Sequence, residues 1–281
     1  MEKVSIDFVK DKFSEIRKKD VVNFNTNYFL TPLDNEVMCL YNENAIVFLQ
    51  PEYDFYRLYY VTLSFEALDV LFQKLPSDIK ICVEIIKKGP LSDAEKQIFN
   101  QHFCFDTTFT RLRLNMKNIK RVKFCNSSDV EYAKENEVDF IYKNLHETFY
   151  QYSSHLPSYS QIKDHVKNNN VVVTRSTTGD ISYFSLFIIN ESHFNFDQLV
   201  SLPCKNDEDL FTLLNYMYTV IRDNGATNGH LWVDEINNGN VVLLHKFYGY
   251  IPDGTKNHIF LSKALNDSKD DKETYLKIKT H

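Results

Sequence analysis

The chain has 281 residues, which suits two domains better than one, since globular domains usually contain about 100 to 200 residues. Hydrophobic residues make up 43% of it and aromatic residues 14%, enough apolar material to offset the entropy of folding, so an intrinsically disordered chain is excluded. With 32 Lys and Arg against 38 Asp and Glu, the formal net charge is -6, and nucleic acid is not expected as a partner.

No apolar run approaches the roughly 20 residues that cross a bilayer, and the N-terminus lacks the apolar core of a signal peptide. The five cysteines are an odd number and mostly have apolar neighbours, which is typical of reduced core thiols. We therefore expect a cytoplasmic monomer or homodimer with no membrane partner. No Cys-x-x-Cys pair or His-Glu-x-x-His spacing is present, so no metal is expected.

The first half of the sequence begins with a helical pattern and continues with strands. Ile6, Val9, Phe13 and Ile16 share one face of a predicted helix over residues 6–18. From Tyr56 onward the predicted order is β-α-β-α-β. The elements after the first helix are strands over 36–41, 45–49 and 56–63, a helix over 65–75, a strand over 79–86, a helix over 92–103 and a strand over 107–114.

The second half repeats this plan with hardly any matching residues, which indicates duplication. We predict an α/β fold with mixed sheets, in two tandem domains over residues 1–125 and 126–265, followed by a charged tail over 266–281. The predicted elements are helices over 130–149 and 159–167, strands over 170–175, 181–189 and 194–202, a helix over 207–223, a strand over 230–234, a helix over 240–247 and a strand over 257–261.

The segment from Gly229 to Leu261 resembles the GNAT (GCN5-related N-acetyltransferase) superfamily. In that family a strand is followed by Asn-x-x-Ala-x-x-Leu-Tyr-x-x-x-Gly-Phe and a closing strand, and the order of elements over residues 130–261 matches too. Residues 99–112 are similar to the closing helix and strand without the glycine, so the first half resembles a degenerate copy. Asn238, Leu244 and Gly249 are identical to the pattern, whereas Val241, His245 and Tyr250 stand for its Ala, Tyr and Phe.

The resemblance implies an N-acyltransferase that moves an acyl group from acetyl-CoA or another acyl-CoA to a primary amine of a small molecule or amino sugar. In the family the thioester lies between two diverging parallel strands, and its pyrophosphate lies at a helix N-terminus. No Gly-rich turn follows residues 56–63, so we expect no cofactor in the first half. The cofactor-binding residues implied in the second half are Leu199, Val200, Ser201, Leu202, Lys205, Asn206, Asp207 and Asn238.

The pyrophosphate loop departs from the family pattern. Lys205 stands at the Gln/Arg position, but Glu208 and Leu210 occupy glycine positions, where side chains hinder a close approach. Asp207 and Asp209 add carboxylates, which also suit ordinary capping of a helix N-terminus. Two alternatives therefore stay open: a transferase of this type that uses an acyl carrier protein or aminoacyl donor, and a catalytically silent binding module.

Aminolysis of a thioester needs a base for the amine and an acid for the leaving thiolate. The resemblance places His245 at the acid's position, with a partly exposed helix residue as the alternative. Tyr248, one turn further on, could carry the hydroxyl instead or could pack in the core. Glu235, at the end of a strand, is the preferred base or a solvated carboxylate. Asn238 binds the main chain or cofactor, or caps the next helix.

The family places acceptor specificity in its first helices and the loop between them. The corresponding segment is unusually aromatic for a loop. Its side chains would line an acceptor pocket by hydrogen bonding and stacking, or would pack between domains. The residues are Tyr150, Tyr152, His155 and Tyr159.

Overall fold

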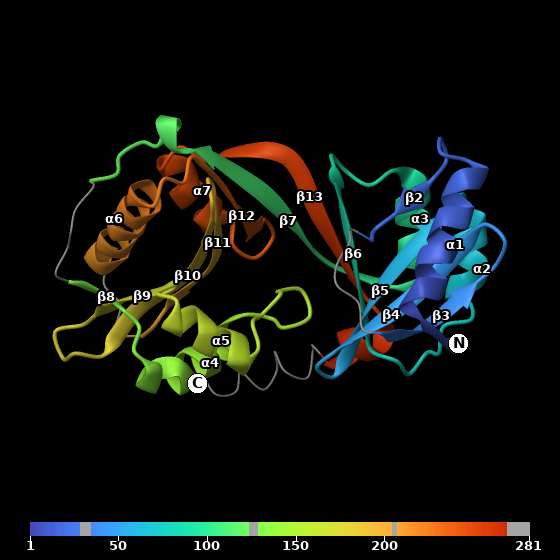
Figure 1. Ribbon diagram of the computed structural model, residues 1–281, viewed down its shortest axis with the longest axis horizontal. Helices are drawn as coiled ribbons and strands as arrows, with labels where there is room; N and C mark the ends of the chain where they lie inside the picture. Colours follow the sequence, from blue (N-terminus) through green and yellow to red (C-terminus); the bar gives the residue numbers. More distant parts are fainter. Residues whose placement is uncertain (29–34, 124–128, 204–206, 269–281) are drawn as a thin grey trace. The chain divides into compact units, whose positions relative to one another are not determined.

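The computed structural model describes residues 1–28, 35–123, 129–203 and 207–268 (Figure 1). The chain forms two compact units. Unit 1 contains Met1–Thr108 and Thr255–His281, and unit 2 contains Phe109–Gly254. The predicted domain boundary between residues 125 and 126 separates the two sequence repeats, and it stays a prediction. Contacts group the chain differently, because the C-terminal strand ends in unit 1.

Unit 1 contains a sheet in the order β1-β3-β4-β5-β6-β13, with β2 paired to β5; β13 is the strand Ile251–Leu261. Among the described strand pairs of this sheet, β5 and β6 are parallel and the others are antiparallel. Ser64 caps α2, and Ser92 and Glu95 form the predicted capping box of α3. The elements are β1 (Glu2–Ser5), α1 (Ile6–Lys19), β2 (Asn25–Thr26), β3 (Glu36–Tyr41), β4 (Ala45–Glu52), β5 (Phe55–Thr62), α2 (Phe65–Phe72), β6 (Ile81–Lys88), α3 (Asp93–His102) and the first part of β7 (Cys104–Asn115).

Alternate residues of β4 face the two sides of this sheet. Val47 and Leu49 pack with α2 and α3 in one core cluster, whereas Ile46 and Phe48 pack with α1 in another. Helices therefore cover both faces, as the near-continuous apolar runs of these strands require.

Unit 2 contains a sheet in the order β7-β12-β11-β10-β9-β8; in the part of the chain that the structure describes, β11 and β12 are parallel and the other pairs are antiparallel. Within this unit α6 and α7 pack on one face of the sheet, and α4 and α5 pack on the other (Figure 1). The elements are η1 (Met116–Asn118), β8 (Val130–Tyr132), η2 (Glu135–Glu137), α4 (Val138–Thr148), α5 (Tyr159–Lys167), β9 (Val171–Arg175), β10 (Ile181–Asn190), β11 (His193–Ser201), α6 (Asp207–Asp223), β12 (Asn228–Asp234), α7 (Gly239–Phe247) and β13 (Ile251–Leu261).

The predicted helix over residues 130–149 is wrong at its start. Residues 130–132 form β8, which pairs with β9, and the α-helix begins only at Val138. Arg175 binds Glu131 and Glu137 and so ties the strand and the following 3-10 turn to β9. Strand pairing therefore overrides the helical pattern of the sequence at this point.

The repeated order of elements is confirmed. Three antiparallel strands lead to a helix, a strand parallel to the third, another helix and a last strand, in β3-β4-β5-α2-β6-α3-β7 and again in β9-β10-β11-α6-β12-α7-β13. The last strands are exchanged between the repeats: β7 pairs with β12, and β13 pairs with β6.

Candidate functional site

The parallel strands of unit 2 pair over three residues only and then diverge. Their register runs from His193 opposite Asn228 to Asn195 opposite His230. Beyond this point β11 stays paired with β10, and β12 stays paired with β7. Among the described residues, the main chain of β11 from Phe196 to Ser201 therefore has no strand partner on the β12 side, and we call it the open edge. Such an edge suits an extended ligand with amide groups.

The predicted cofactor residues fall on and after this open edge. Leu199 packs toward α6 and α7, and the buried Val200 packs toward α4 and α5, so these two residues offer a ligand their main chain rather than their side chains. Ser201 is exposed and Leu202 is buried. Asp207 begins α6. Lys205 and Asn206 lie outside the described residues.

Asp197 is an extra residue in β11, where the strands diverge. Leu186 lies opposite Gln198 and Phe187 opposite Phe196, which makes Asp197 a β-bulge. Asp197 lies at the surface, and partial desolvation of its carboxylate by the surrounding protein raises the pKa of Asp197 to about 6. A carboxylate with this pKa is a suitable general base near neutral pH.

Two buried amide oxygens flank Asp197. Asn195 Oδ1 and Gln198 Oε1 have no hydrogen-bond partner among the described residues. A buried acceptor without a donor is costly, so the arrangement favours a ligand that carries N–H groups. Sequence reasoning missed Asp197; the signal is a carboxylate directly after Phe196 within an apolar strand.

A polar face lies on the side of the unit 2 sheet away from α6 and α7. Phe194, Leu231 and Leu112 pack with these helices, and alternate residues of the same strands point the other way. The polar face consists of His193, Asn195, His230, Trp232, Arg111 and Arg113.

His245 lies inside the core rather than partly exposed, so that alternative is wrong. Its side chain is 2% exposed, and its ring contacts Phe196 and Tyr250 at centroid distances of 5.2 and 5.3 Å. Burial lowers the pKa of His245 to about 4, so the imidazole is neutral at pH 7. Its role as the acid stays a prediction, which requires donor binding to raise this pKa.

The burial of His245 predicts a loss of stability in mild acid. The unfolded chain protonates His245 near pH 6.5 and the folded chain only near 4, so its contribution is complete above 6.5 and is lost as pH falls toward 4. About 3 kcal/mol of the unfolding free energy should disappear across this window. Urea denaturation at several pH values between 4 and 7 measures this loss. The unfolding free energy should change less with pH in His245→Leu than in the parent chain, whereas His155→Gln, at an exposed position, should match the parent chain. An equal pH dependence of the unfolding free energy in His245→Leu and the parent chain would contradict this prediction.

The remaining predicted catalytic residues have structural contacts. Tyr248 is 1% exposed, and its ring contacts the tilted ring of Tyr218 at a centroid distance of 5.1 Å; burial raises the pKa of Tyr248 to about 12. Glu235 is exposed just after β12. Asn238 occupies the N-cap position of α7, where its side chain makes no capping bond. These contacts favour packing for Tyr248.

The described contacts of the predicted acceptor residues lie at two places. Tyr150 and Tyr152 contact each other edge to face at 4.8 Å. Tyr159 donates to Asp139 at 2.5 Å and contacts Tyr142, both on α4, and His155 is exposed. The structure thus brings Tyr150 and Tyr152 together, and a common acceptor pocket for the four residues stays a prediction.

The equivalent divergence in unit 1 is filled by the chain itself. β5 and β6 pair only from Tyr56 opposite Ile81 to Leu58 opposite Val83. The Asn27 amide nitrogen then donates to Leu58 O at 3.0 Å and Glu84 O at 2.9 Å, and Tyr60 N donates to Asn27 Oδ1 at 2.7 Å. β2 pairs with the next residues of β5. Asn27 and β2 therefore occupy the main-chain groups that stay open in unit 2.

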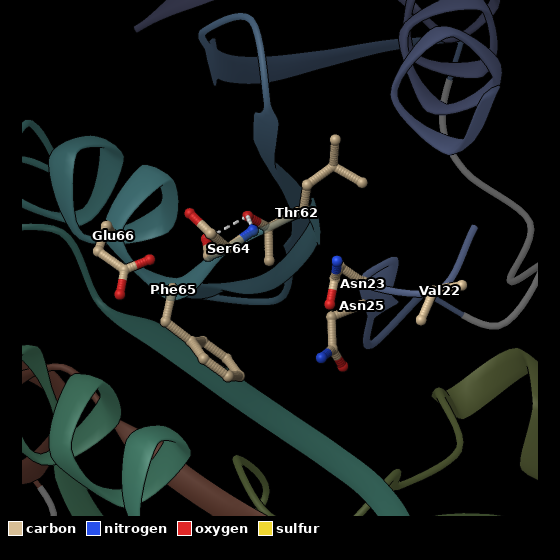
Figure 2. Close-up of a pocket in the computed structure, with 8 residues that line it drawn as sticks. Val22, Asn23, Asn25, Thr62, Ser64, Phe65 and Glu66 are labelled. Atoms are coloured by element: carbon tan, nitrogen blue, oxygen red, sulfur yellow. Dashed lines mark hydrogen bonds between the residues drawn. The ribbon is translucent and has the colours of Figure 1, made fainter. Parts of the chain in front are cut away.

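A pocket of about 300 Å³ lies beside this filled divergence, at the N-terminus of α2 (Figure 2). One wall is formed by Val22, Asn23 and Asn25, and the other by residues 62–66. Glu66 places a carboxylate in the first turn of the helix, which opposes binding of an anion there.

Asn27→Ala should destabilise the protein by about 2–4 kcal/mol, because the change leaves three main-chain groups of β5 and β6 without their partner. Urea denaturation measures the difference. Asn25→Ala is the matched control: its side chain is exposed, its main chain pairs with Thr62, and we expect a change within about 0.5 kcal/mol. Similar losses for both variants would show that Asn27 does not bridge the strands.

No protein-family model and no curated protein sequence matches the chain. Solved structures do match its fold. A GCN5-related N-acetyltransferase from Sphaerobacter thermophilus has a TM-score of 0.57 at 13% identity, over 78% of this chain and 76% of that one. A GNAT-family acetyltransferase from Colwellia psychrerythraea has a TM-score of 0.50 at 10% identity, over 94% of this chain and 100% of that one. A Drosophila protein has a TM-score of 0.54 at 13% identity, over 94% and 98%.

These likenesses extend over both units and concern the fold. The chain has the GNAT fold, so this prediction is confirmed. No helix in the described ranges is long and apolar enough to cross a membrane. Within the same ranges, no three His, Cys, Asp or Glu side chains gather as metal ligands would.

Proposed function

We propose that the chain is an N-acyltransferase in which unit 2 holds a thioester donor along the open edge of β11 and transfers its acyl group to a primary amine. The observation that supports this most is the contrast between the two divergences: Asn27 and β2 fill the one in unit 1, whereas the one in unit 2 combines the open edge with Asp197.

The proposed reaction is a direct transfer. The amine nitrogen attacks the thioester carbon, a C–N bond forms, and the C–S bond breaks. The thiolate leaves and takes up a proton from solvent, and the proton that the amine loses returns to solvent through the base. Asp197, mostly ionised at pH 7, accepts the proton that the amine loses. Asn195 Oδ1 and Gln198 Oε1 accept hydrogen bonds from the amine and orient it. Glu235 is the second candidate for the base.

The start of α6 decides which donors fit. Glu208 and Asp209 lie in its first turn, where a pyrophosphate would meet carboxylates rather than a glycine-rich loop. A donor without a nucleotide, such as an acyl carrier protein or an aminoacyl group, avoids this repulsion. CoA thioesters remain the first donors to test, because in the proposed binding mode the divergence contacts the pantetheine part, which CoA shares with an acyl carrier protein.

Calorimetric titration of the full chain with acetyl-CoA, acetyl-pantetheine and an acetylated acyl carrier protein tests the proposal. We expect saturable thioester binding, with acetyl-pantetheine within about threefold of acetyl-CoA because the pyrophosphate gains little at an acidic helix start. Asp197→Asn should bind equally well, since this side chain meets the amine. Absence of binding by all three donors would overturn the proposal and leave a silent binding module.

A further inference from the structure

Two arginines of the polar face share one carboxylate. Arg111 Nη2 and Nε lie 2.7 and 2.9 Å from Asp253 Oδ2, and Arg113 Nε lies 2.9 Å from the same oxygen. Two guanidinium groups thus meet at one carboxylate oxygen.

Aromatic and imidazole rings lie beside these guanidinium groups. The Arg111 guanidinium lies 5.7 Å from the ring centroid of Trp232, and His193 Nε2 lies 2.8 Å from His230 Nδ1. Burial, His193 and the two guanidinium groups lower the pKa of His230 to about 4, so His230 is neutral at pH 7. The face therefore offers positive charge beside flat rings.

Arg113 is the accessible member of the cluster. Its side chain is 55% exposed, and its Nη groups have no partner among the described residues. A guanidinium whose two Nη groups face outward can bind a carboxylate or phosphate through both of them, in a bidentate geometry.

We propose that Arg113, supported by Arg111 and Trp232, binds an oxyanion of the amine acceptor, a carboxylate or a phosphate. This rests on the proposed function. Asn195 lies opposite His230, which lies opposite Arg113, so the main chains of Asn195 and Arg113 are two strand spacings, about 10 Å, apart on the same face of the sheet.

Trp232 is the only tryptophan of the chain, so its fluorescence reports on this face without any turnover. We expect a saturable change on titration of the full chain with inorganic phosphate or with acetate, and none with acetamide. The anion that binds more tightly identifies the group on the acceptor. Arg113→Gln should weaken binding about tenfold or more. Arg222→Gln, an exposed arginine on α6 that pairs with Asp223, is the control and should bind like the parent chain.

A flat response to both anions, or equal affinity of Arg113→Gln and the parent chain, would overturn the inference. The proposed function is judged separately, by thioester binding and turnover. Once an acceptor is found, Arg113→Gln should raise KM for the anionic amine and leave KM for its neutral amide unchanged, with kcat nearly constant for both.

Discussion

Asp197→Asn should lower kcat by about 10² to 10⁴, the usual loss for a general base, and leave donor affinity unchanged. Asparagine keeps the size and polarity of the side chain at the bulge but cannot accept the proton of the amine. In the parent chain kcat/KM should rise with pH through about 6, where Asp197 ionises, and this step should vanish in the variant. Steady-state rates from pH 5 to 8 measure both effects.

Glu235→Gln separates the two candidate bases. Glu235 lies after the end of β12, and its loss should change kcat less than threefold if Asp197 takes the proton. A large loss in Glu235→Gln together with an active Asp197→Asn would assign the base to Glu235, as the sequence pattern predicts.

Arg57→Leu should lower the free energy of unfolding by about 3–5 kcal/mol. Arg57 is 1% exposed; its Nε and Nη2 donate to Glu52 at 2.7 and 2.8 Å, and its Nη1 pairs with Glu84. Glu84 is 8% exposed, so losing the guanidinium leaves a buried carboxylate without its cation. Urea denaturation at pH 7 measures the loss.

Two further variants test the physical reason. Lys80→Leu removes a surface ion pair with Asp54 in the same unit and should cost less than about 1 kcal/mol. The double variant Arg57→Leu/Glu84→Leu should recover part of the stability, since no buried charge is then left unpaired. If the double variant loses as much unfolding free energy as the two single variants together, packing rather than charge pairing accounts for the contribution of Arg57.

The elements with a clear period were predictable from the sequence. Ser92 and Glu95 correctly predicted the start of α3, because a capping box involves residues only three positions apart and so needs no distant partner. β1 and β2 were missed because strands of four and two residues depend on a partner far along the chain, at Glu36–Cys39 and at Val61–Thr62.

The site was less predictable than the fold. The bulge at Asp197 arises from a register shift against β10, which a single strand's pattern does not encode. His245 was read from a family position, but its burial depends on Phe196 and Tyr250 packing around it. Asn27 offered no sequence signal, since its role is to bridge two strands that lie more than 30 residues away.

The exchange of β7 and β13 also sets the order of events during synthesis. Ile81 N donates to Ser262 Oγ across 181 residues, so β6 waits for its second neighbour until nearly the whole chain has left the ribosome. Such a high contact order slows folding, because loop closure must precede the stabilising contacts. Until then the edge of β6 exposes unpaired main-chain groups, which are a site for pairing with another nascent chain.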